Sequence, residues 1–177
     1  MVADAAQSIL AAWGGKTPLD VTVLDDDAIR KDPSLLFDAL EAVSLLGDKR
    51  GVRVRIIVPG EHIDSDTVRN ASRATWGPLL QAGATIAEYA PTMYHCKLLI
   101  VDGLLTSVGS TNFDNRSFRL NDEATLNIVD RAFASAQTAN VETDLALAHS
   151  VSYAAWQARP ARERFGEWVA SVIGTQL

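Results

Sequence analysis

Short apolar runs alternate with longer amphipathic segments along most of the chain. The runs are rich in β-branched residues and end at Gly, Pro or Asp, which is typical of strands. We predict strands at residues 21–24, 52–58, 85–89, 94–101, 105–112 and 123–129. The segments between them repeat apolar residues every three or four positions, which is typical of helices. We predict helices at residues 5–13, 33–46, 68–82, 131–152 and 163–173. This alternation predicts an α/β fold, with a mixed β-sheet flanked by helices on both faces.

The strands at 94–101 and 105–112 are separated by Asp102-Gly103, a pair that favours a tight hairpin turn. His95 and Lys97 are two residues apart, so on a strand both side chains leave the same face. Cys96 then points to the other face, and we expect it to be a core residue. The hairpin therefore predicts an imidazole and an ammonium group side by side.

The composition narrows the class of protein. With 177 residues, 47% of them hydrophobic and 21% charged, the chain is typical of a globular domain. The net charge of −6 weighs against nucleic acid as a partner, because non-specific nucleic-acid binding depends on clustered Lys and Arg. A single cysteine excludes an intrachain disulfide. No apolar run reaches the roughly 18 residues of a membrane span, and no signal peptide is evident. We expect a cytoplasmic protein with at most peripheral membrane contact.

Further polar residues gather where the second hairpin strand ends. Ser110 and Asn112 share one face, and the pairing of the strands can bring them beside His95 and Lys97. Such a patch suits a phosphodiester, because an imidazole can attack phosphorus and form a covalent intermediate. Lys97 and Asn112 can hold the non-bridging oxygens. Glu123 begins the next apolar strand and can orient the imidazole, as the carboxylate does in a catalytic triad.

The order of these residues resembles the HKD signature of the phospholipase D superfamily. His95-Cys96-Lys97 is followed by Asp102 and then by Gly109-Ser110-Thr111-Asn112. The flanking segment 113–123 resembles bacterial cardiolipin synthases, as do the segments 58–60, 76–80 and 89–94. The resemblance implies a poorly matched N-terminal segment at 1–34 and a phospholipase D-like catalytic domain at 35–177. It also implies that this domain is one half of such a fold.

The resemblance implies a role for each residue of the signature. His95 would be the nucleophile or its acid/base counterpart, and Glu123 would pair with its imidazole. The implied phosphate ligands are Lys97, Ser110 and Asn112. Asp102 lies at the turn and Gly109 allows close backbone approach, so both are structural. The resemblance implies no metal and no cofactor.

The implied reaction is phosphatidyl transfer through a phosphohistidine, from phosphatidylglycerol to cardiolipin, or hydrolysis of phospholipase D type. Enzymes of this family use two HKD motifs, whereas this chain has one. His62 and His149 lack the signature. We expect His62 to be exposed and non-catalytic, and His149 to lie on a helix and have no catalytic role. The second motif would come from a homodimer mate or from a missing N-terminal half. The alternatives are a dimeric phosphodiesterase or nuclease, and an inactive half-site that only binds phosphate.

The C-terminal segment, about 156–177, reads as an amphipathic helix. Its apolar stripe contains Phe165, Trp168, Val169, Val172 and Ile173. Arg159, Arg162 and Arg164 lie nearby in the sequence. One interpretation is a helix that packs on its own domain or on a missing half. The other is an interfacial helix that docks on anionic lipid.

Overall fold

The computed structural model describes residues 20–24, 53–63, 66–110 and 123–174. Within these residues the strands form a seven-stranded sheet in the order β6-β5-β4-β1-β2-β3-β7. The strands are β1 (Asp20–Leu24), β2 (Arg53–Pro59), β3 (Thr85–Tyr89), β4 (Leu98–Val101), β5 (Leu105–Gly109), β6 (Thr125–Val129) and β7 (Ala148–Val151). The helices are α3 (Asp66–Ala74), α4 (Trp76–Gln81), α6 (Arg131–Ala146), α7 (Tyr153–Gln157) and α8 (Ala161–Gly174). The helices predicted at 5–13 and 33–46 lie outside the described residues.

The sheet is mixed, as predicted, because it contains both parallel and antiparallel strand pairs. β1, β2 and β3 are parallel neighbours, whereas β4, β5 and β6 form an antiparallel meander and β7 runs antiparallel to β3. β1 joins the halves, since it pairs parallel with β2 and antiparallel with β4. The sheet therefore includes residues on the N-terminal side of residue 35. The domain boundary at that position stays a prediction.

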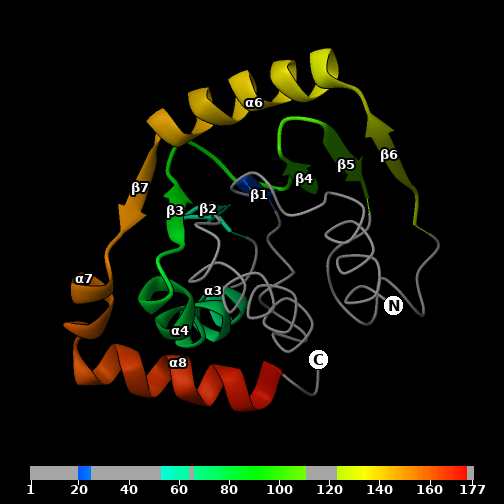
Figure 1. The fold of residues 1–177 in the computed structure, drawn as a ribbon. Helices are drawn as coiled ribbons and strands as arrows, with labels where there is room; N and C mark the ends of the chain where they lie inside the picture. The colour runs from blue at the N-terminus through cyan, green and yellow to red at the C-terminus, as the bar shows by residue number, and fades with distance from the viewer. Residues whose placement is uncertain (1–19, 25–52, 64–65, 111–122, 175–177) are drawn as a thin grey trace.

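Helices cover both faces of the sheet, which confirms the predicted architecture. In Figure 1, α6 crosses one face from the end of β6 to the start of β7, while α3, α4 and α8 lie together on the other side. β2 alternates between the two cores. On the α4 side the buried cluster contains Val54, Ile56, Val58, Trp76, Leu79 and Ile86. On the α6 side it contains Ile57, Tyr94, Leu98, Ile100, Ala134 and Val141.

The helix predicted at 68–82 is in fact two helices, α3 and α4, that meet at Thr75. The backbone amide and the hydroxyl of Thr75 both donate to Ser72 O, at 3.0 and 2.8 Å, which closes α3. Pro78 has no N–H to continue the helical ladder, and a proline is tolerated only in the first turn of a helix. A new helix therefore begins at Trp76.

The helix predicted at 131–152 was too long. α6 ends at Ala146, and the following residues form β7 along the edge of β3. His149 consequently lies on a strand rather than on a helix, paired with Glu88 and exposed to solvent. The pairing gives β3 a second hydrogen-bonded neighbour, a tertiary demand that local helix propensity does not reveal.

The predicted hairpin at Asp102-Gly103 is confirmed. Both residues have positive φ, 52° and 56°, and Leu104 N–H donates to Val101 O at 3.0 Å. A two-residue turn of this kind matches the twist of the flanking strands. The strands are shorter than predicted, since β4 begins at Leu98 and β5 ends at Gly109.

A network of ion pairs fastens α8 to the rest of the fold. Glu167 of α8 binds Arg159 at 2.8 Å and Arg73 of α3 at 3.4 Å, while its own side chain is only 3% exposed. Glu88 of β3 binds Arg69 at 2.8 Å and Arg73 at 3.6 Å. Burial lowers the pKa of Arg159, and Glu167 opposes that shift. The network therefore connects α8 through α3 to the sheet.

Replacing Glu167 with Ala tests this network. Arg159, 7% exposed, would lose its buried carboxylate, so we expect the free energy of unfolding in urea to fall by about 3–5 kcal/mol. The matched control is Glu163→Ala, an exposed position on the same helix, with an expected change within about 0.5 kcal/mol. Equal losses from the two variants would refute the role of the network.

Candidate functional site

The candidate site lies at the sheet edge where the three parallel strands end. Leu98, the first residue of β4, pairs with Leu24, the last of β1, so the segment before β4 reaches this edge. Gly109 ends β5 opposite Thr125, which begins β6, so both strands meet the same edge. Ligands of open α/β sheets bind outside the carboxyl ends of parallel strands. This edge collects four of the predicted site residues: His95, Lys97, Ser110 and Glu123.

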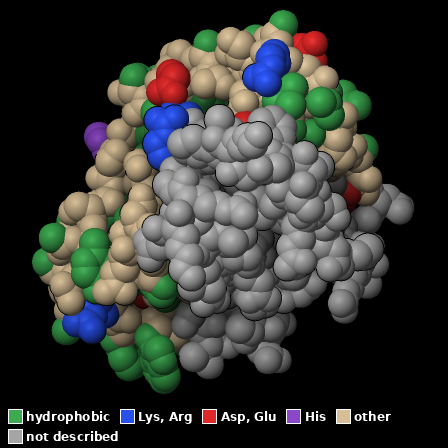
Figure 2. All heavy atoms as spheres, viewed as in Figure 1, with side chains coloured by type: hydrophobic (Ala, Val, Ile, Leu, Met, Phe, Trp, Pro, Cys, Tyr) green, Lys and Arg blue, Asp and Glu red, His purple; other side chains and the backbone are tan. Residues whose placement is uncertain are grey.

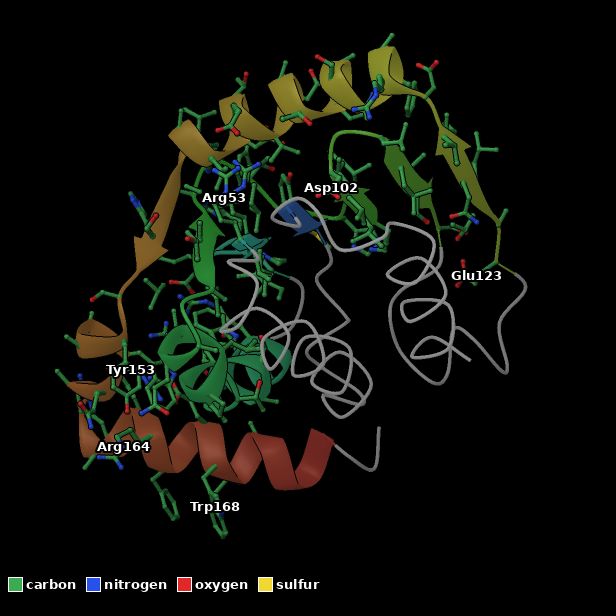
Figure 3. The ribbon with its side chains drawn as sticks, viewed as in Figure 1. Arg53, Asp102, Glu123, Tyr153, Arg164 and Trp168 are labelled. Atoms are coloured by element: carbon green, nitrogen blue, oxygen red, sulfur yellow. The ribbon has the colours of Figure 1, made fainter. Side chains whose placement is uncertain are left out.

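One predicted residue of the signature, Asp102, lies away from this edge. Asp102 occupies the turn after β4, at the opposite edge from Glu123, as Figure 3 also shows. Its place supports the structural role proposed for it. Asn112 lies outside the described residues, so its part in the site stays a prediction.

A row of three residues crosses the strands at the site edge. Gly109 N–H donates to Lys97 O at 3.2 Å, and Gly109 pairs with Thr125 on its other side. Residues directly opposite each other on neighbouring strands share a face. His95 lies two residues before Lys97, and Glu123 lies two residues before Thr125, so both come just before the outer members of this row.

Gly109 allows this row to close tightly. A Cβ atom on Gly109 would lie 2.1 Å from Ala124 O and 2.7 Å from Thr125 Cα, far inside contact distance. The glycine therefore brings β5 and β6 together without a side chain between Lys97 and Thr125. This geometry supports the structural role that the sequence suggested for Gly109.

Lys97 carries a buried positive charge beside His95. Its residue is 7% exposed, and its Nζ donates to the carbonyl oxygen of His95 at 3.4 Å. A buried ammonium loses hydration and is stabilised by an anion that binds next to it. The position of Lys97 is consistent with a phosphate ligand.

Cys96 is exposed, so the prediction of a core cysteine was wrong. β4 begins at Leu98, and the three residues before it are not part of the strand. The alternation of a strand therefore does not govern the segment that holds His95 and Cys96. Inside β4 the alternation does hold, since Leu98 and Ile100 are buried.

Ser110 is one residue out of line with Lys97, since Gly109 takes the position opposite Lys97. It pairs instead with Ala124: its N–H donates to Ala124 O at 3.0 Å, and its hydroxyl accepts from Ala124 N–H at 3.1 Å. A hydroxyl that accepts can still donate its own hydrogen to a phosphate oxygen. The hydroxyl therefore holds the start of β6 in place and keeps the capacity of a phosphate ligand.

Tyr94, which the sequence reasoning did not single out, anchors the segment that carries His95. The residue is 5% exposed, its hydroxyl donates to Asp144 of α6 at 2.7 Å, and its ring lies 4.6 Å from that of Tyr89. Burial first, and then the hydrogen bond to Asp144, raise the pKa of Tyr94 well above its usual value. The only signal in the sequence was the resemblance of segment 89–94 to cardiolipin synthases.

A small pocket of about 150 Å³ lies beside the carboxyl ends of β2 and β3. Its lining consists of Gly60, Glu61, Arg69, Glu88, Tyr89, Ala90 and His149. Gly60 N–H donates to Tyr89 O at 3.0 Å and so joins the two strand ends. His62 is exposed, as expected, and does not line the pocket.

Among the residues that the structure describes, no three His, Cys, Asp or Glu side chains are grouped so that they could hold a metal ion. Over the same ranges, none of the helices has the length and apolar character needed to cross a bilayer.

The family model and similar relatives identify the same protein family. The family model described as "Cardiolipin synthase, PLD-like domain" matches residues 32–145. The minor cardiolipin synthase ClsB of Bacillus subtilis is 38% identical over 125 residues, which cover 71% of this chain and 31% of that protein. Cardiolipin synthase A of Erwinia tasmaniensis is 45% identical over 119 residues, 67% of this chain and 24% of that protein. The chain thus spans about a quarter to a third of the length of these relatives.

Solved structures support the same fold. The phospholipase D family member Nuc from Salmonella typhimurium superposes with a TM-score of 0.58 at 18% identity, over 78% of this chain and 84% of that chain. Phosphatidylserine synthase from Haemophilus influenzae gives a TM-score of 0.64 at 14% identity, over 89% of this chain and 42% of that chain. At such identities the likeness concerns the fold alone.

Replacing Gly109 with Ala tests the tight approach of β5 and β6. We expect the free energy of unfolding to fall by about 1–3 kcal/mol, because the new methyl group meets backbone that must shift. The matched control is Gly166→Ala inside α8, where an added Cβ meets nothing within 4 Å. There we expect a gain of about 0.5–1 kcal/mol in chemical denaturation. A neutral Gly109→Ala variant would contradict the packing argument.

Tyr94 makes the free energy of unfolding depend on pH in the alkaline range. Its pKa is about 10.0 in the unfolded chain and higher in the fold, so below pH 10 both states keep the proton and the group adds no slope. As the pH rises above about 10 the unfolded state ionises first, and the free energy of unfolding falls by up to about 1.4 kcal/mol per pH unit. Tyr94→Phe should remove this slope and cost about 1 kcal/mol at neutral pH.

The control for Tyr94 is Tyr153→Phe, which removes a hydroxyl bonded to Gln81 and leaves Tyr94 in place. Urea denaturation across the alkaline range should show the same slope for this control as for the unmodified chain. An unchanged slope in Tyr94→Phe would rule out Tyr94 as its source.

Proposed function

Because the chain belongs to the cardiolipin synthase, phospholipase D-like domain family, we propose that it forms one half of a phosphatidyl-transfer site. The observation that carries the proposal is the single sheet edge that collects His95, Lys97 and Glu123. An imidazole, a buried ammonium and a carboxylate beside the ends of β4 and β6 form a set suited to a phosphodiester. The fold seen in the solved relatives supports this assignment.

In the proposed reaction His95 is the nucleophile. One imidazole nitrogen attacks phosphorus of a phosphatidylglycerol-like substrate, an N–P bond forms, and the P–O bond to the headgroup glycerol breaks. The departing glycerol oxygen takes a proton from an acid on the other side of the phosphate. Lys97, with Ser110 and Asn112, holds the non-bridging oxygens as negative charge builds on them.

In the second step the hydroxyl of an acceptor attacks phosphorus and the N–P bond breaks. The base that takes the acceptor's proton is the group that acted as acid in the first step. A second phosphatidylglycerol as acceptor gives cardiolipin, and water gives the hydrolytic reaction. Glu123 lies two residues before Thr125, which shares a row with Lys97. Its carboxylate would hold the imidazole of His95 in one tautomer and orientation.

The one HKD signature of this chain provides the nucleophile, so the acid/base group has to come from elsewhere. We propose that it comes from a second HKD motif, carried by a homodimer mate or by a further part of the protein. The short span of this chain relative to the cardiolipin synthases supports the second source. The match to Nuc covers 84% of that chain, so the two chains are similar in size, which supports a homodimer mate as the source. The proposed place of action is the cytoplasmic side of the membrane that holds the phospholipid.

The first experiment measures solution mass by light scattering together with turnover of bis-p-nitrophenyl phosphate. We expect turnover that follows the dimer population, and a loss of more than about 10³-fold in His95→Ala, as for other nucleophile deletions. Glu123→Gln should lower turnover by roughly 10⁴-fold, as loss of the orienting carboxylate does in a catalytic triad.

Other outcomes would overturn parts of the proposal. An inactive monomer would mean that the chain is a half-site, which needs another segment for the acid/base group. Turnover that survives His95→Ala would exclude the phosphohistidine. Cleavage of DNA with salt-dependent binding, and no turnover of phosphatidylglycerol, would favour a dimeric nuclease.

A further inference from the structure

Helix α8 turns its two aromatic side chains to solvent rather than to the protein. Glu167 and Ala170, 3% and 6% exposed, face the body of the protein, and Glu167 binds Arg73 of α3. Phe165 and Trp168 are 66% and 60% exposed. In Figure 3, Trp168 points away from the body of the protein. Phe165 and Trp168 of the predicted apolar stripe therefore do not form the contact with α3.

Phe165 and Trp168 form one aromatic surface, with ring centroids 6.1 Å apart. Large aromatic side chains bury much apolar area and are highly buried on average. Two neighbouring rings left in water carry an unfavourable hydration free energy that docking would remove. Exposed apolar patches rimmed by polar residues mark protein or membrane contacts.

The charges around this aromatic surface are basic, although the chain as a whole carries −6. Arg162 and Arg164 are exposed, and at about 3.6 residues per turn they lie on opposite flanks of the aromatic pair. The same spacing turns Glu163, which is also exposed, away from the aromatic pair. Figure 2 shows hydrophobic side chains at the lower edge of the molecule with a basic side chain close by. The outer face of α8 thus combines aromatic rings with two arginines.

We propose that this outer face of α8, defined by Arg162, Arg164, Phe165 and Trp168, docks on a bilayer surface that contains anionic phospholipid. Helices that lie in the membrane interface combine Trp or Phe with basic residues, and each arginine gains from the negative surface potential. A lasting protein interface buries about 800 Å² on each partner, more than two aromatic rings offer. Docking would place the enzyme on its substrate surface, and in this respect alone it rests on the proposed function.

Vesicle co-sedimentation tests the docking without any need for activity. We expect the chain to sediment with phosphatidylcholine vesicles that contain phosphatidylglycerol. Phe165→Ser with Trp168→Ser should weaken this binding by more than about tenfold, because the buried apolar area is lost. Arg162→Gln with Arg164→Gln should weaken it by about 30-fold on the anionic vesicles, and little on phosphatidylcholine alone.

The matched control removes two exposed apolar side chains elsewhere, Val129→Ser with Leu147→Ser, at positions 72% and 49% exposed. We expect this variant to bind vesicles as the unmodified chain does. Thermal melts show whether each variant is folded. If the serine pair on α8 fails to fold, the arginine pair, at two exposed positions, still gives the answer.

The remaining outcomes separate docking from catalysis. Turnover of a short-chain, water-soluble phosphatidylglycerol should be unchanged in the α8 variants, while turnover of vesicle substrate falls with binding. If the unmodified chain does not sediment with anionic vesicles, or if all variants bind equally, docking by α8 is excluded whatever the activity. Self-association that disappears in the serine variant, without vesicle binding, would show instead that the face binds protein. A chain that docks while its turnover survives His95→Ala would overturn the proposed function alone.

Discussion

The register between β4 and β5 is the constraint on which the candidate site depends. The tight turn at Asp102-Gly103 sets this register at one edge of the sheet, and the site forms at the other edge, where Gly109 lies opposite Lys97. A shift by one residue would turn every side chain of the strand to the opposite face. The turn thus sets the register of the candidate site without belonging to it, and the packing of Gly109 against β6 extends the same register to the strand that follows Glu123.

Two kinds of interaction hold the layers around this sheet. On one face α6 packs through apolar residues and through the hydrogen bond that Tyr94, next to His95, donates to Asp144. On the other face α8 is attached through α3 by buried ion pairs centred on Glu167. The side of α8 that faces α3 carries Glu167 and Ala170, while Phe165 and Trp168 lie on the outside.

Much of the fold could be predicted from the sequence, because the strands and the Asp102-Gly103 turn carry strong local signals. The break at Thr75 follows from Pro78, but β7 could not be predicted, since only the neighbouring strand β3 makes those residues a strand. The gathering of His95, Lys97 and Glu123 at one edge follows from the hairpin and the order of the strands. Three details needed the structure: the exposure of Cys96, the position of Ser110 opposite Ala124, and the anchoring of Tyr94, whose partner Asp144 is remote in sequence.

The meander of β4, β5 and β6 has a further consequence, for the order in which the molecule folds. Hairpin contacts such as that across Asp102-Gly103 join residues close together in sequence, so they form at a small cost in chain entropy. The pairing of β1 with β4, and of β3 with β7, closes much longer loops and is expected to be slower. The strands that carry the candidate site can thus nucleate assembly, and the parallel strands then join a framework whose reactive edge has already taken shape.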